Sequence, residues 1–146
     1  MASRSLPYGA FNFLVDLGDG TSGGFSDVSG LSTEMTVAEY RNGNEKVNYV
    51  HKIPGINKSS DVTLKRGIIR SDDLWAWIEQ TRTAGPVAKR DVVITLLSES
   101  GEPVQGWRLR AAMPLKYTGP TLAAKGGGDV AMEELVLSIE SLERVT

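Results

Sequence analysis

A short stretch near the N-terminus has the spacing of a phosphate-binding loop. Gly18, Gly20 and Gly23 form the pattern G-x-G-x-x-G behind an apolar run, and Glu39 follows at the distance of a ribose-binding carboxylate. In a dinucleotide site such glycines open a helix, whose N-terminal N–H groups hold the pyrophosphate. Here FSDVSGLSTEMTVAEYR follows, which alternates like a strand and has no helical apolar stripe. Because Asp19-Gly20 is a hairpin turn signal, the pattern favours strand, turn and strand over a nucleotide site.

Residues that could act as nucleophile, base or metal ligand are few. The single histidine, His51, lies in a polar stretch, and the chain has no cysteine and no G-x-S-x-G motif. Nucleophilic catalysis needs a base within hydrogen-bond reach, and a tetrahedral zinc site needs several His or Cys ligands. We therefore expect no catalytic residue, no metal and no cofactor.

Two acidic pairs and two arginines are the remaining candidates for chemistry. Asp72-Asp73 begins a predicted helix, where the helix dipole favours negative charge. Glu133-Glu134 lies on a predicted strand, where neighbouring side chains point to opposite faces and cannot form a close dyad. Arg108 and Arg110 share one strand face, which suits phosphate binding and, equally well, a solvated or interface-facing strand.

The elements that must position these residues follow from apolar periodicity. It predicts about seven strands, including residues 11–17, 35–41, 60–68, 90–100 and 104–115, and a final strand within 130–145. One helix is expected at about residues 71–84, with Ser71 as its N-cap and Gly85-Pro86 as its end. Its face with Leu74, Trp75 and Ile78 should pack on a sheet. We expect a mainly-β or α+β fold, a small antiparallel β-barrel or sandwich-like domain.

Composition sets further limits on the function. The chain of 146 residues suits one domain, 1–146, with 40% apolar and 23% charged residues. A net charge of −2 argues against general binding to nucleic acid or an anionic membrane. The sequence shows no secretory signal and no apolar run long enough to span a membrane, so we expect a soluble protein made in a cytosol.

Residues 45–60, EKVNYVHKIPGINKSS, have little periodicity and are expected to form a long loop or an extended arm. Loops of this length inside compact domains usually carry function or contacts. The basic residues gathered here lack the aromatic ladder of a single-strand nucleic-acid site. An acidic patch on another subunit is therefore the favoured partner.

Four segments in order resemble the tail tube proteins of contractile phage tails and of phage-tail-like contractile injection systems. They are FNFLVDLG at 11–18 with GGFSDVSGLSTEMTVAEYRNG at 23–43, KIPGINKSSDVTLKRGI at 52–68, LWAWI at 74–78, and WRLRAAMPLKYTGP at 107–120 followed by VAMEELVLSIESLERV at 130–145. GFSDVSGL alone is a weak signal, whereas the ordered combination is a strong one and covers nearly the whole chain. The glycine-rich stretches at 18–24 and 126–128 depart from the family pattern and are expected only to lengthen hairpin loops.

The resemblance implies a structural protein. Six subunits would form a ring, with their strands joined into one barrel around a lumen, and the rings would stack into a hollow tube. Contraction of a surrounding sheath would drive this tube through a target envelope. A strand with Met35 and Val37 toward the core and polar residues opposite suits such a channel wall. The candidate lumen-facing residues are Glu34, Thr36, Ala38, Arg108 and Arg110.

The resemblance also implies partners and a location. Beyond other copies of the chain, these are a sheath protein, baseplate or hub proteins, tube-terminating proteins, and DNA or protein effectors as cargo. The protein would be made in the bacterial cytoplasm and become part of a phage tail or injection particle. The candidate inter-ring or inter-subunit contacts are Asn44, Lys46, Tyr49, His51, Lys52, Pro54, Gly55 and Lys58.

Other functions stay open at this point. Within the family, the alternative is a tube-initiator or baseplate-hub protein of the same fold. Outside it, the alternative is an enzyme, acting as a nucleotide-binding protein through Gly18–Gly23 or like a lysozyme through a carboxylate pair. Rings or tubes of the purified protein would support the structural role, and turnover or nucleotide binding by a monomer would support the enzyme.

Overall fold

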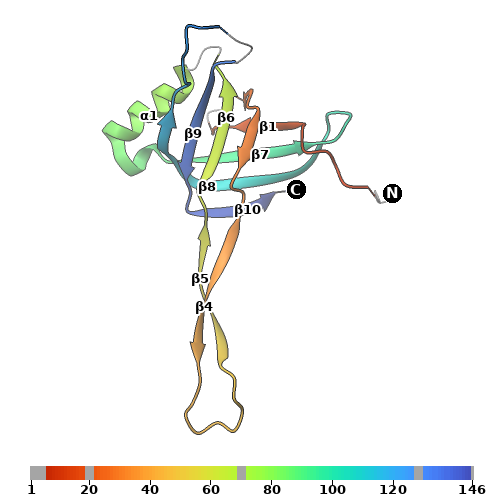
Figure 1. Ribbon diagram of the computed structural model, residues 1–146, viewed down its shortest axis with the longest axis vertical. Helices are drawn as coiled ribbons and strands as arrows, with labels where there is room; N and C mark the ends of the chain where they lie inside the picture. Colours follow the sequence, from red (N-terminus) through yellow and green to blue (C-terminus); the bar gives the residue numbers. More distant parts are fainter. Residues whose placement is uncertain (1–5, 19–21, 69–71, 127–129, 146) are drawn as a thin grey trace.

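The computed structural model describes residues 6–18, 22–68, 72–126 and 130–145. These residues form ten strands, paired antiparallel, one α-helix and one short 3-10 helix (Figure 1). The predicted mainly-β fold with one flanking helix is confirmed, with ten strands in place of about seven. The expected turn at Asp19-Gly20 and the expected N-cap Ser71 lie outside the described residues.

One long strand connects the two parts of the main sheet. The strand order is β2-β1-β7-β8-β9-β6-β3, and β10 pairs with β8. The first half of β8 pairs with β7 and β10, and its second half pairs with β9. Figure 1 shows β7, the start of β8 and β10 running across the view, while β6 and β9 run nearly upright. The bounds are β1 Phe13–Asp16, β2 Ser22–Gly23, β3 Asp27–Ser29, β6 Val62–Gly67, β7 Arg90–Leu97, β8 Pro103–Thr118, β9 Met132–Ser138 and β10 Ser141–Val145.

The hydrophobic core lies between these two strand groups and the helix. Burial of its apolar side chains is the main force that holds the fold together. The buried members are Val15, Leu17, Phe25, Val62, Leu64, Leu74, Trp77, Ile78, Val92, Ile94, Leu109, Ala112, Leu135 and Leu137. Phe11, at the start of the strand expected over residues 11–17, precedes β1 and is exposed.

The helix α1 (Asp72–Ala84) buries a different tryptophan from the one expected. Leu74, Trp77 and Ile78 are buried at the spacing of one helical face, whereas Trp75 is 47% exposed. The prediction of a buried Trp75 is therefore wrong, because this residue lies at the flank of the apolar stripe. The predicted end of the helix is confirmed, since Gly85 has φ +65° and begins the 3-10 helix η1 (Gly85–Ala88).

A bulge in β8 changes the face on which its residues lie. Between the pairs Arg90–Ala112 and Val92–Leu109, β8 has one more residue than β7. Ala111 has φ +51°, and its N–H donates to the Asp91 carboxylate at 3.0 Å. Ala112 is consequently buried in place of Ala111, and the alternation expected for a regular strand over 104–115 fails at this point.

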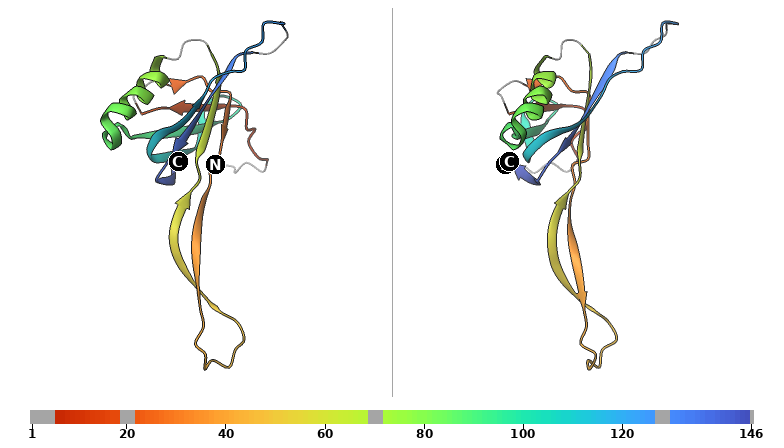
Figure 2. Two further views of the ribbon diagram at one scale, coloured as in Figure 1. Left: turned by 60° about the vertical axis from the view of Figure 1, so that its left-hand side comes forward. Right: turned by 90° about the vertical axis from the view of Figure 1, so that its left-hand side faces the viewer.

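A separate two-stranded ribbon projects far from the main sheet (Figures 1 and 2). It consists of β4 (Thr33–Tyr40), β5 (His51–Ser59) and the connection 41–50, which together we call the arm. Of the two forms expected for residues 45–60, a long loop or an extended arm, the extended arm is confirmed, because residues 51–59 form a strand. Pro54 is tolerated because, among the described residues, β5 pairs with β4 alone, so the missing N–H can point to the open side.

A second bulge lies in the middle of the arm. The Thr36 hydroxyl accepts the Ile56 N–H at 2.8 Å and donates to the Ile56 carbonyl at 3.1 Å. A Cβ on Gly55 would stand 2.5 Å from that hydroxyl, so glycine is required here. Met35 and Val37, expected to face the core, are each 52% exposed because the arm lies outside the body.

Candidate assembly surface

Four strands form a sheet with two open edges. We call β3, β6, β9 and residues 113–118 of β8 the four-strand sheet. Successive strands in it are antiparallel. Among the described residues, β3 pairs only with β6, and residues 113–118 pair only with β9. Each edge thus carries backbone groups that can pair with another chain.

The two faces of the four-strand sheet differ in burial. One face carries core residues such as Leu64 and Leu135, which oppose each other in register. The outward face carries the row Asp27, Lys65 and Glu134, also in register, with the Lys65 ammonium 4.0 Å from the Glu134 carboxylate. This outward face is polar and is not covered by the core.

A charged group is buried behind the same sheet. The Arg66 guanidinium donates to the Glu133 carboxylate at 2.7 Å, and the two residues are 8% and 2% exposed. The Tyr117 hydroxyl donates to the other oxygen of Glu133 at 2.7 Å. This hydrogen bond, followed by burial, raises the pKa of Tyr117 above its usual value of 10.0. The acidic pair at 133–134 is thus split between two faces, as expected for a strand.

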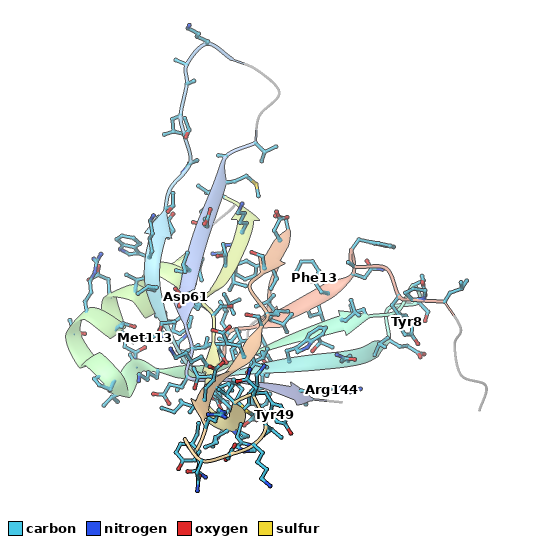
Figure 3. All side chains as sticks on the ribbon, turned by 60° about the horizontal axis from the view of Figure 1, so that its bottom comes forward. Tyr8, Phe13, Tyr49, Asp61, Met113 and Arg144 are labelled. Atoms are coloured by element: carbon cyan, nitrogen blue, oxygen red, sulfur yellow. The ribbon has the colours of Figure 1, made fainter. Side chains whose placement is uncertain are left out.

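The end of the arm is folded around one arginine that sequence reasoning missed. Arg41 Nε and Nη2 donate to the Val47 carbonyl at 3.0 and 2.8 Å, and Nη2 also donates to the Glu45 carbonyl. His51 Nε2 lies 3.1 Å from the Glu45 carboxylate. Tyr49 is 63% exposed at this end (Figure 3). No pattern in the sequence of residues 41–51 indicated this arginine-centred connection.

All eight candidate contact residues lie on the arm and are exposed. They occupy its end and β5: Asn44, Lys46, Tyr49, His51, Lys52, Pro54, Gly55 and Lys58. The register adds a feature that the sequence did not show. Lys52 lies opposite Glu39 and Lys58 lies opposite Glu34, so each lysine faces a carboxylate of its own chain.

The candidate lumen-facing residues do not lie together. Glu34, Thr36 and Ala38 are on the arm, at alternate positions of β4. Arg108 and Arg110 are on the first half of β8, where their guanidinium groups lie 3.8 and 3.7 Å from the Glu143 carboxylate of β10. Arg110 also lies 3.6 Å from Asp91. The arginines therefore belong to a different strand group from the four-strand sheet and the arm.

No membrane-crossing helix is found in the described part of the chain, since α1 is too short and too polar for that role.

Comparison with known families gives a match over nearly the whole chain. The family model described as T4-like virus tail tube protein gp19 matches residues 9–143. A comparison with curated proteins found no significant match.

Solved structures of contractile particles are similar over the full fold. The anti-feeding prophage cap, described as its tube terminating cap, is 26% identical with a TM-score of 0.86, over 100% of this chain and 95% of that chain. The PVC sheath/tube terminator of an extracellular contractile injection system is 29% identical with a TM-score of 0.85, over 99% and 100%. The PVC sheath-tube complex is 29% identical with a TM-score of 0.83, over 97% and 93%.

Proposed function

Because this chain belongs to the T4-like virus tail tube protein family, we propose that its copies close into hexameric rings that stack into the hollow tube of a contractile particle. The resemblance seen in the sequence is confirmed by the family match and by the PVC and anti-feeding prophage structures. The protein is a structural tube protein of a phage tail or phage-like injection particle. The number of six copies per ring is part of the proposal.

The observation that carries this proposal is the strand order of the four-strand sheet. Its four strands alternate in direction, so β3 and residues 113–118 of β8, at opposite edges, also run antiparallel. Rotation about a ring axis places β3 of one copy beside β8 of the next in the antiparallel orientation. Ring closure would satisfy both edges and join the sheets into one barrel.

The outward face of the four-strand sheet then lines the channel. The opposite face is covered by the helix and core of the same copy, which must lie outside the barrel. The channel wall would carry rows of Asp27, Lys65 and Glu134, with one net negative charge per row. Such a mildly acidic wall does not bind the phosphates of DNA, so a cargo can slide along it. DNA and protein effectors are therefore both compatible cargoes, and Arg108 and Arg110 are proposed to lie away from the channel.

The proposed partners are those that the family resemblance implies, and the similar sheath-tube and terminator structures support the sheath and the terminating protein among them. They are a contractile sheath, a baseplate or hub, and a tube-terminating protein, and the chain would be made in the bacterial cytoplasm before assembly. A position at the end of the tube is the second candidate. It is favoured by the similarity to the anti-feeding prophage tube terminating cap.

Ring and tube formation by the purified chain is the direct test. Across a concentration series, we expect sedimentation to show a hexamer and negative-stain microscopy to show rings that elongate into tubes of uniform diameter. Rings that never elongate at any concentration would indicate the terminating position. A compact monomer at high concentration, with no rings, would contradict the proposed function.

Charge reversal in the arm tests its contribution to stacking. We expect Lys52→Glu with Lys58→Glu to preserve the fold of the body and to shorten the tubes seen by microscopy, with high salt shortening wild-type tubes as well. Each such ion pair contributes only about 0–1 kcal/mol, but the contact repeats around every ring.

A charge-swapped control separates contacts within the arm from contacts between copies. Glu34→Lys and Glu39→Lys, added to the two lysine reversals, restore the opposite charges across β4 and β5. If the lysines act on a neighbouring copy, the swapped arm still gives short tubes. Recovery of normal tubes would show that the lysines act only within their own arm.

A further inference from the structure

An open groove lies between the helix and one edge of the four-strand sheet. It has a volume of about 380 Å³ and is lined by Trp75, Ile78, Thr81 and Arg82 of α1 and by Pro114, Leu115, Lys116 and Tyr117 of β8. Those β8 residues belong to the segment 113–118, whose outer edge has no partner strand among the described residues. The groove therefore runs beside the edge at which a further strand can be added.

The side chain of Trp75 is exposed in the groove, and its neighbours hold it in position. Trp75 packs edge-on against Tyr117, with ring centroids 5.6 Å apart and an interplanar angle of 77°. The Arg82 guanidinium lies 5.5 Å from the Trp75 ring centroid. Tyr117 is in turn held by its hydrogen bond to the buried Glu133. Trp75 is thus a positioned, half-exposed aromatic, which is the usual character of an interface anchor.

A bulge adds a second apolar group. Between the pairs Pro114–Leu137 and Lys116–Val136, β8 has one extra residue, Leu115, which is 55% exposed. A bulge re-aims the side chain of its extra residue. Here Leu115 lines the groove together with Trp75, so both walls present an apolar group to whatever lies between them.

We propose that this groove receives the strand β3–β4 of a second copy of the chain, with Trp75 and Leu115 as the apolar anchors. The inference rests on the proposed ring. A strand that pairs with residues 113–118 must lie along the groove. Every second side chain of that strand points to the face of the sheet on which Tyr117 lies. The strand β4, which follows β3 in the chain, carries the exposed apolar residues Met35 and Val37, and such a contact can cover them.

Replacement of Trp75 tests the groove without disturbing the core. We expect Trp75→Ala to leave the melting temperature of the unassembled chain nearly unchanged and to raise the concentration needed for ring formation at least about tenfold, the effect of an interface hot spot. Trp75→Phe keeps an aromatic face and should restore most of the assembly. Val87→Ala, at an 84% exposed apolar position of η1, is the matched control and should assemble as the wild type does.

Cross-linking gives an independent measurement, because the natural chain has no cysteine. Leu115→Cys combined with a single cysteine at Leu31 or Met35 should yield a disulfide between copies for at least one of the two pairs. None of the single-cysteine variants should cross-link to itself. No cross-link for any pair in assembled rings would overturn the proposal.

The outcomes of these experiments distinguish the proposed groove contact from the proposed ring. Normal rings from Trp75→Ala would overturn the groove contact and leave the proposed function standing. If those normal rings also fail to bind purified sheath protein, the groove belongs to the sheath instead. A wild-type chain that forms no rings would overturn both proposals.

Discussion

Replacement of Trp77 by alanine is expected to lower the free energy of unfolding by about 3–5 kcal/mol. The side chain is 0% exposed and sits in the core. Its indole N–H donates to the Ala88 carbonyl at 2.9 Å, which ties the helix to the end of η1. The Arg90 guanidinium lies 5.0 Å from its ring. Alanine would leave a large cavity and remove the hydrogen-bond donor of a buried carbonyl.

Urea or guanidinium unfolding followed by circular dichroism measures this loss. Trp75→Ala is the matched control, since it removes the same side chain two residues away from a half-exposed position. We expect only a small change in unfolding free energy for the control. Equal destabilisation by the two substitutions would contradict the assignment of Trp77, and not Trp75, to the core.

Replacement of Glu133 by alanine is expected to cost about 3–5 kcal/mol of stability, because it removes a carboxylate that a buried guanidinium faces. Arg66 and Glu133 are almost fully buried, and their side chains lie 2.7 Å apart. Glu133→Gln keeps the shape and the acceptor oxygen but loses the charge, so its cost should be intermediate. Thermal and chemical unfolding of the two variants checks this order, and an equally stable Glu133→Ala would contradict it.

Because of Tyr117, the stability that this buried group contributes depends on pH, and the direction of the dependence can be predicted. Its raised pKa means that the folded chain holds the phenol proton more tightly than the unfolded chain does. The hydrogen bond to Glu133 therefore contributes fully below pH 10, and its contribution is lost as the pH rises from about 10 toward the folded-state pKa. Melting temperatures measured from pH 9 to 11 should fall less steeply for Tyr117→Phe than for the wild type.

The sequence predicted those elements whose signals are local. The end of α1 at Gly85-Pro86 depends on glycine in the left-handed region, and the glycine indeed has φ +65°. The strand at Val62–Gly67 shows the regular alternation of buried and half-buried residues that was expected. In both cases neighbouring residues determine the structure, so the chain order alone carries the information.

Features that depend on a distant strand were not predictable in the same way. The alternation in β8 changes at Ala111 because β7 is one residue shorter across the bulge, and no residue near Ala111 indicates this. Pro54-Gly55 has the composition of a loop, yet it lies in a strand because Thr36 supplies the hydrogen bonds across the bulge. The open edges and the groove beside Trp75 likewise exist only after the strands have paired.

The antiparallel order of the four-strand sheet has a consequence for the bore of the proposed tube. Each copy contributes an even number of strands, so neighbouring strands stay antiparallel around the whole barrel whatever the number of copies. Backbone pairing would be equally complete with one copy fewer or one copy more. The circumference must therefore be set by the curvature built into each copy, at the bend of β8 and at its bulges, because barrel diameter grows with strand number. Hydrogen bonding closes the ring, and the shape of the single subunit decides how wide it is.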